Sequence, residues 1–145
     1  MSSPRALGVD FGERRIGLAV SDPTNTLAMP LETLKRRAGK RPPIKQMAEI
    51  GARHQVGQVV MGLPVSLDGT EGEWCAEVRA VGEKLAARLD VPVAFVDERM
   101  TSVRAERAVR SSGLSKSARE EKGRIDAAAA QLILQAWLDN PEVAR

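Results

Sequence analysis

The sequence predicts an α/β protein built on a mixed five-stranded sheet with helices packed against it. Five short apolar runs have the character of strands, and four longer segments repeat apolar residues at helical spacing. Short turns join the first three strands, which favours antiparallel pairing, whereas the last two strands alternate with helices, which favours parallel pairing. The 145 residues are expected to form one domain over 1–140, followed by a short tail at 141–145.

The strands are predicted from apolar runs bounded by glycine, proline or polar residues. The last two runs are almost continuously apolar, which is typical of strands that are covered on both faces. The five predicted strands are Ala6–Phe11, Ile16–Ser21, Thr26–Leu34, Gln58–Gly62 and Pro92–Asp97.

The helices are predicted from apolar residues that recur three, four or seven positions apart. Gly113 is a stop signal for the third helix, and Asn140-Pro141 ends the fourth. The four predicted helices are Pro42–His54, Glu71–Leu89, Thr101–Ser112 and Ala118–Leu138.

The composition limits the chemistry that the chain can perform. It has one cysteine, Cys75, and one histidine, His54, which excludes an internal disulfide and a multi-histidine metal site. Any metal must therefore be held mainly by carboxylates, whose hard oxygens suit Mg²⁺ or Mn²⁺. No apolar run approaches the roughly 20 residues that cross a bilayer, and no secretory signal is recognisable. A cytoplasmic protein without a membrane partner is therefore expected.

Asp10 is placed where the first predicted strand ends. A buried charge without a partner is costly, so an acid at the protected end of a strand is usually paired or holds a metal. Gly12 follows two residues later and permits a close approach of another group. The alternative is an aspartate that simply opens a hairpin turn.

Two further acids are expected at the same edge of the sheet. Asp97 and Glu98 end the last predicted strand, and since neighbouring side chains point to opposite faces, only one of them is expected to share a site with Asp10. Asp126 begins an apolar helical face that continues through Ala130 and Ile133, so it is expected to point toward the sheet.

Three converging carboxylates repel one another unless cations lie between them. Two divalent ions about 3.5–4 Å apart would suit such a cluster and would activate water against a phosphodiester. Two alternatives remain open: Asp97 forms a plain salt bridge with Arg99, and Asp126 pairs with Lys122. The Leu63–Gly72 loop is expected to leave the fourth strand at this same edge.

A basic segment accompanies these acids. Six of the eleven residues from Lys35 to Lys45 are Lys or Arg, and the net charge is +3. Such residues can hold phosphates of a nucleic acid, although a charge run is also common on a solvated loop without a partner. The aromatic residues, including Trp74, are expected in the core. The candidate phosphate-binding residues are Arg14, Arg15, Arg36, Arg37, Lys40 and Arg41.

Four segments together form a specific combination: Gly8–Gly12 with Arg15–Ala19, Gly62–Pro64 with Asp68–Gly72, Asp97–Ser102, and Ile125–Ala130 with Ile133–Gln135. In this order they resemble the YqgF/RuvX family of bacterial Holliday junction resolvase-like proteins, which are also assigned as pre-16S rRNA processing nucleases. The resemblance covers nearly the whole chain. Met100-Thr101-Ser102 stands where the family usually has an apolar residue and two threonines, which is a conservative difference.

The resemblance implies a ribonuclease H-like fold and metal-dependent phosphodiester hydrolysis, with Asp10, Glu98 and Asp126 as catalytic and metal-binding acids and Mg²⁺ or Mn²⁺ as cofactor. Its substrate would be pre-16S rRNA, processed at its 5′ end, Holliday junction DNA, or both. Symmetric cutting of a four-way junction would need two active sites and hence a homodimer.

Two other function classes compete with the nuclease. The first is a non-catalytic nucleic-acid-binding factor in transcription or ribosome assembly, which the basic segment supports equally well. The second is a sugar-kinase or actin-like ATPase, because Gly-Val-Asp-x-Gly also opens that fold. Such ATPases usually need two lobes, and this chain has room for about one domain.

Overall fold

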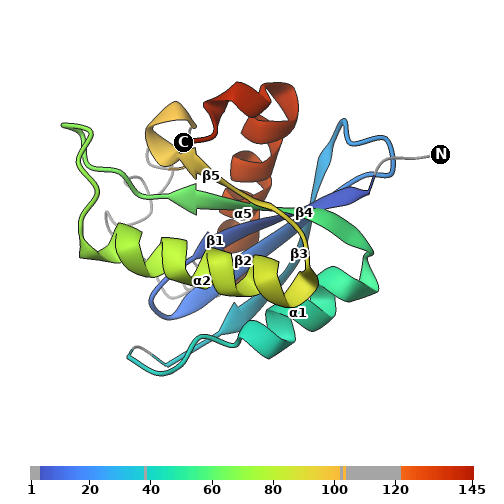
Figure 1. Ribbon diagram of the computed structural model, residues 1–145, viewed down its shortest axis with the longest axis horizontal. Helices are drawn as coiled ribbons and strands as arrows, with labels where there is room; N and C mark the ends of the chain where they lie inside the picture. The colour runs from blue at the N-terminus through green and yellow to red at the C-terminus, as the bar shows by residue number, and fades with distance from the viewer. Residues whose placement is uncertain (1–3, 38, 102, 104–121) are drawn as a thin grey trace.

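The computed structural model describes residues 4–37, 39–101, 103 and 122–145. Its strands form one five-stranded sheet in the order β3-β2-β1-β4-β5. Helices α1 and α2 cover one face of the sheet and α5 covers the other (Figure 1). The strands are β1 Arg5–Phe11, β2 Arg15–Ser21, β3 Ala28–Lys35, β4 Val56–Leu63 and β5 Val93–Asp97. The helices are α1 Ile44–Arg53, α2 Glu73–Leu89 and α5 Lys122–Asp139, with short 3₁₀ turns η1 Glu98–Met100 and η2 Pro141–Val143.

The predicted strand pairing is confirmed. β1 pairs antiparallel with β2, and β2 pairs antiparallel with β3. β4 pairs in parallel with β1, and β5 pairs in parallel with β4. Among the residues described, no helix has both the length and the apolarity to span a bilayer.

Several element boundaries differ from the predicted ones for local reasons. β3 begins at Ala28 rather than Thr26, because the Asp22 carboxylate accepts hydrogen bonds from the backbone N–H groups of Thr26 and Leu27 and holds them in a turn. α1 begins at Ile44 because the residue before a proline disfavours helical geometry, which keeps Pro42 outside the helix.

Other boundaries shift by a few residues. β4 extends over Val56–Leu63 and is longer than predicted, and α2 begins at Glu73 rather than Glu71. The third predicted helix, Thr101–Ser112, lies outside the described residues apart from Thr101 and Val103.

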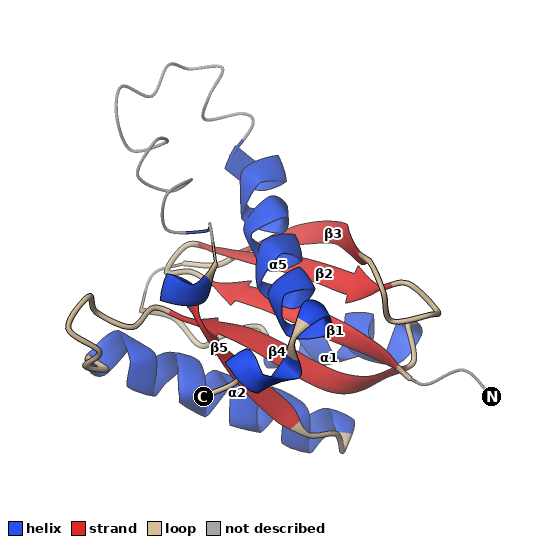
Figure 2. Cartoon of the chain, turned by 90° about the horizontal axis from the view of Figure 1, so that it is seen from above, coloured by secondary structure: helices blue, strands red, loops and turns tan. Residues whose placement is uncertain are grey.

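The two faces of the sheet hold two different cores. Along β1, Leu7, Val9 and Phe11 point into a large apolar cluster beneath α1 and α2. The alternate residues face α5 and are small, as Ala6 illustrates. Figure 2 shows α5 lying across this second face. Side-chain size therefore distinguishes the two layers.

Glycine lets α5 approach the sheet closely. A Cβ atom at Gly8 would lie 2.7 Å from the Cβ of Leu134 and 3.0 Å from the carbonyl oxygen of Ala130. A Cβ atom at Gly62 would collide with the Cδ1 of Ile133. These positions require glycine because the helix occupies the space that a side chain would fill.

Candidate active site

Asp10 lies near the end of β1 and is buried, with 5% of its surface exposed. It is two residues beyond Gly8, so its side chain points to the same face of the sheet as Gly8, toward α5. Its partner on β2 is Gly17, which has no side chain. The predicted acid therefore lies on the face with small residues.

Glu98 follows directly after β5 and begins the η1 turn. It is 3% exposed, and a Cβ atom at Gly62 would lie 3.0 Å from its Oε1 atom. Met61 pairs with Val9, so Gly62 and Asp10 are at the same level on adjacent strands. The Glu98 carboxylate thus reaches over β4 on the α5 face, toward the strand that carries Asp10.

Asp126 belongs to α5, and its side chain lies outside the part of the chain that is described. The direction of the helix is clear from other contacts. Gln135 accepts a hydrogen bond from the backbone N–H of Ala28, which lies at the end of the sheet where β1 begins. Ala130 lies against Gly8, which is further along β1. The helix therefore runs antiparallel to β1. The helix backbone at Asp126 is one turn closer than Ala130 to the edge where β1 ends.

Asp97 has a different environment from Glu98. Its carboxylate forms a 2.6 Å ion pair with Arg99 Nη2 and also accepts hydrogen bonds from Arg99 N and from Arg145 Nη1. Burial raises the pKa of Asp97, but the hydrogen bonds and charges of the two arginines outweigh it and leave the pKa below its ordinary value. The salt bridge between Asp97 and Arg99, left open by the sequence, is therefore present.

Arg99 and Arg145 also form hydrogen bonds with the loop that follows β4, and they connect this loop to Asp97. Arg99 Nη1 donates to the carbonyl oxygen of Leu67 at 3.4 Å, and Arg145 Nη2 donates to that of Gly69 at 3.0 Å. Arg145 also pairs with Glu71, whose other cationic partner is Arg79. The hydrogen bond from Arg79 lowers the pKa of Glu71. This network fixes the loop beside the turn that carries Glu98.

The basic residues predicted to hold phosphates gather near the β1–β2 turn. The backbone N–H of Arg36 donates to the carbonyl oxygen of Arg14 at 2.8 Å, which joins the basic segment to that turn. Arg15 begins β2. The side chains that are exposed to solvent are Arg14, Arg37, Lys40 and Arg41.

Arg36 differs from the other basic residues. Its guanidinium lies 4.7 Å from the centre of the Phe11 ring, and its Nη2 donates to the carbonyl oxygen of Lys40 at 2.7 Å. The Phe11 ring also stacks on Trp74, with 5.6 Å between ring centroids. An arginine and two aromatic rings therefore form one continuous stack.

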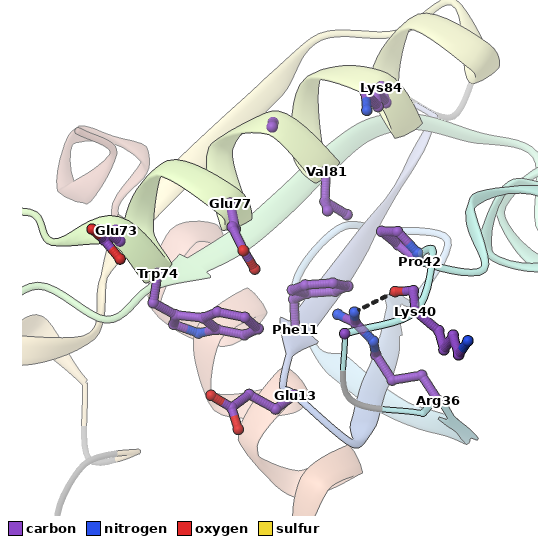
Figure 3. Close-up of a pocket in the computed structure, with 12 residues that line it drawn as sticks. Phe11, Glu13, Arg36, Lys40, Pro42, Glu73, Trp74, Glu77, Val81 and Lys84 are labelled. Carbon is purple, nitrogen blue, oxygen red and sulfur yellow. Dashed lines mark hydrogen bonds between the residues drawn. The ribbon is translucent and has the colours of Figure 1, made fainter.

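The structure also contains a cavity that the sequence did not predict. It has a volume of about 610 Å³ and lies between α2, the end of β1 and the basic segment (Figure 3). Phe11 is in the core as predicted, but Trp74 is only partly buried and lines the cavity. A signal for this was present in the sequence, because residues three, four and seven positions apart share one face of a helix. On α2 that face forms a wall of the cavity and consists of Trp74, Glu77, Val81 and Lys84.

The donor set at the edge consists of carboxylate oxygens. Within the described residues there is no group of three or more His, Cys, Asp or Glu side chains that could hold a metal. Asp10 and Glu98 supply two hard oxygen donors on one face, which is the chemistry that Mg²⁺ and Mn²⁺ require. These two residues fit a divalent-cation site that takes a further ligand from elsewhere.

Comparison with known proteins gives concordant results. Residues 4–140 match the family model described as "RuvX: Holliday junction resolvase". The chain is 44% identical over 135 residues to a protein of Anaeromyxobacter sp. (strain K) named "Putative pre-16S rRNA nuclease", covering 93% of this chain and 96% of that protein. A Mycobacterium leprae (strain Br4923) protein of the same name is 44% identical over 137 residues, covering 93% of this chain and 72% of its own length.

A solved structure shares the fold. It is Thermus thermophilus RuvC in complex with a Holliday junction substrate, with a TM-score of 0.55, 15% sequence identity and 99% coverage of both chains. The mixed sheet and its strand order therefore form a ribonuclease H-like fold, as the resemblance implied.

Proposed function

This chain belongs to the RuvX family, and from that premise we propose that it is a divalent-metal-dependent endonuclease that hydrolyses phosphodiester bonds. The observation that carries the proposal is the placement of Asp10 and Glu98. Both carboxylates are buried on the same face of the sheet, at the ends of strands separated by one strand. Burying two like charges on one face of the sheet is costly unless positive charge compensates them.

We assign three acids to the metal site: Asp10, Glu98 and Asp126. Asp126 completes the set because its turn of α5 lies toward the edge at which β1 ends. When bound, two divalent cations would lower the pKa of an attacking water and neutralise charge on the phosphate. The family resemblance and the hard oxygen donors both support Mg²⁺ or Mn²⁺.

The remaining residues have positioning roles in this proposal. Asp97 caps the η1 turn by accepting a hydrogen bond from Arg99 N, which fixes the backbone that carries Glu98. The basic side chains near the β1–β2 turn would hold phosphates and set the register of the nucleic acid. These side chains are Arg14, Arg15, Arg36, Arg37, Lys40 and Arg41.

The substrate is proposed from the names of the relatives. The curated relatives are named for pre-16S rRNA, whose 5′ end we propose as the site of cleavage, and the family description names the Holliday junction. Activity on either substrate would place the protein in the cytoplasm. A homodimer is expected only if the junction is the substrate, because symmetric cutting needs two active sites.

A cleavage assay tests the proposal. Wild-type protein is incubated with a pre-16S rRNA 5′-end fragment and with a four-way DNA junction, each with Mg²⁺, with Mn²⁺ and with a chelator. We expect metal-dependent cleavage of at least one substrate, and loss of cleavage in the Asp10→Asn variant with binding retained. Sedimentation of the same preparation reports its oligomeric state.

Two results would contradict the nuclease. Full cleavage by Asp10→Asn in Mn²⁺ would remove Asp10 from the active site. Binding of both substrates without cleavage under any metal condition would instead favour a non-catalytic binding factor, which the exposed Arg37, Lys40 and Arg41 could also serve.

A further inference from the structure

The cavity beside α2 opens at the same edge of the sheet as the proposed active site. Phe11 lines it and directly follows Asp10, so the cavity wall and the first proposed catalytic acid are adjacent residues of β1. The two side chains point to opposite faces of β1. The cavity and the proposed active site therefore lie on opposite faces at one end of the same strand.

The cavity has opposite charges at its two ends. Figure 3 shows Glu13, Glu73 and Glu77 around Trp74, whereas Arg36, Lys40 and Lys84 lie on the far side of Phe11 and Val81. Such a charge distribution suits a ligand with an anionic group at one end and N–H donors at the other. A nucleotide has this chemistry, because its phosphate is anionic and the edge of its base carries N–H donors.

Size and surface agree with a nucleotide. The volume of about 610 Å³ is within the range of roughly 300–1,000 Å³ that is typical of ligand sites. Trp74 is partly buried and one face of its indole stacks on Phe11, so a base at the acidic end would stack on the remaining face.

Arg36 supplies positive charge at one end of the cavity. Its Nε and Nη1 atoms are buried, so a ligand in the cavity would be attracted by the charge of the guanidinium and would not form a hydrogen bond with these two atoms.

We propose that this cavity binds one nucleotide of the substrate strand, with its phosphate toward Arg36, Lys40 and Lys84 and its base toward Trp74 and the glutamates. The proposal rests on the proposed nuclease function for the origin of the nucleotide. The binding step itself can be measured without cleavage.

Trp74 provides the signal for the test. The chain has two tryptophans, so the Trp137→Phe variant leaves Trp74 as the sole indole. Guanosine 5′-monophosphate is titrated into this variant while Trp74 fluorescence is recorded, with free N-acetyltryptophanamide as the control for light absorption by the ligand. We expect saturable quenching.

Three comparisons make the test specific. Lys84→Gln should weaken the affinity about fivefold, whereas Arg88→Gln, which removes an exposed charge one turn further along α2, should leave it unchanged. Ribose 5-phosphate, which carries the phosphate without a base, should bind at least about tenfold more weakly than the nucleotide. Repeating the titration with the deoxyribonucleotide shows whether the cavity prefers RNA or DNA.

The outcomes separate this proposal from the nuclease proposal. No saturable quenching, equal effects of Lys84→Gln and Arg88→Gln, or equal binding of ribose 5-phosphate would overturn the nucleotide site even if the protein cleaves nucleic acid. Quenching that persists in an Asp10→Asn variant would support the site whether or not the wild type cleaves.

Discussion

The two faces of the sheet differ in the size of the side chains that they bury. Beneath α1 and α2, the face is filled by Leu7, Met61, Leu63 and other large apolar residues. Beneath α5, glycines and alanines dominate, and the same face holds Asp10 and Glu98. Small residues let the helix come close to the sheet on this face. One face therefore supplies most of the apolar burial, whereas the other carries the two buried acids that we propose as catalytic.

The largest expected effect separates two neighbouring acids. Glu98→Gln should reduce cleavage about a thousandfold, because it removes a proposed metal ligand. Asp97→Asn should reduce metal affinity and activity about tenfold, because Asp97 acts through the turn that carries Glu98. Initial cleavage rates across a Mn²⁺ titration measure both. Equal losses in the two variants would mean that Asp97 also belongs to the metal site.

The second expected effect concerns the face with large residues. Met61 is fully buried, so Met61→Ala should lower the free energy of unfolding by about 3 kcal/mol through lost burial and the cavity that remains. Met29→Ala is the matched control, since Met29 is 39% exposed and should cost much less. Urea denaturation measures both. A smaller loss at Met61 than at Met29 would contradict the assignment of the main core.

A smaller effect is expected on the face with small residues. Gly8→Ala should lower the free energy of unfolding by about 2 kcal/mol, because the new methyl group would lie too close to Leu134 and to the Ala130 carbonyl. Gly72→Ala should cost about 1 kcal/mol or less, since a Cβ atom there meets nothing within 4 Å and only the N-cap preference of α2 is lost. If Gly8→Ala were as stable as Gly72→Ala in the same denaturation experiment, α5 would not be packed closely on β1.

The smallest expected effect is a pH dependence that arises from Asp97. Its pKa is below the ordinary value of 3.8 in the folded protein, so the unfolded state binds its proton more readily. The stabilisation is therefore fully present above this ordinary value and is lost as the pH falls through the folded pKa. Asp97→Asn should flatten the acid limb of a plot of melting temperature against pH. An unchanged acid limb would show that the ion pair with Arg99 adds no net stability.

The sheet was predictable because its signals are local in the sequence. Apolar runs joined by short turns predicted the antiparallel pairing of β1, β2 and β3, and the intervening helices predicted the parallel pairing of β4 and β5. The start of β3 was not predictable from propensity, because a side chain, that of Asp22, decides it by capturing two backbone N–H groups.

The candidate site was only partly predictable from the sequence, because some of its features depend on tertiary contacts. The choice between Asp97 and Glu98 depends on which face each side chain takes and on Arg145, which is distant in sequence and bonds to Asp97. The cavity was missed because Trp74 has a core-like spacing along α2, and only the tertiary structure shows that part of it lines an open volume.

The metal site is tested most directly by anomalous diffraction from a crystal of the wild-type protein soaked in Mn²⁺. We expect anomalous peaks for manganese between β1, η1 and α5, with carboxylate oxygens of Asp10, Glu98 and Asp126 as ligands. Well-ordered carboxylates that point away from one another, with no manganese peak near them, would contradict it.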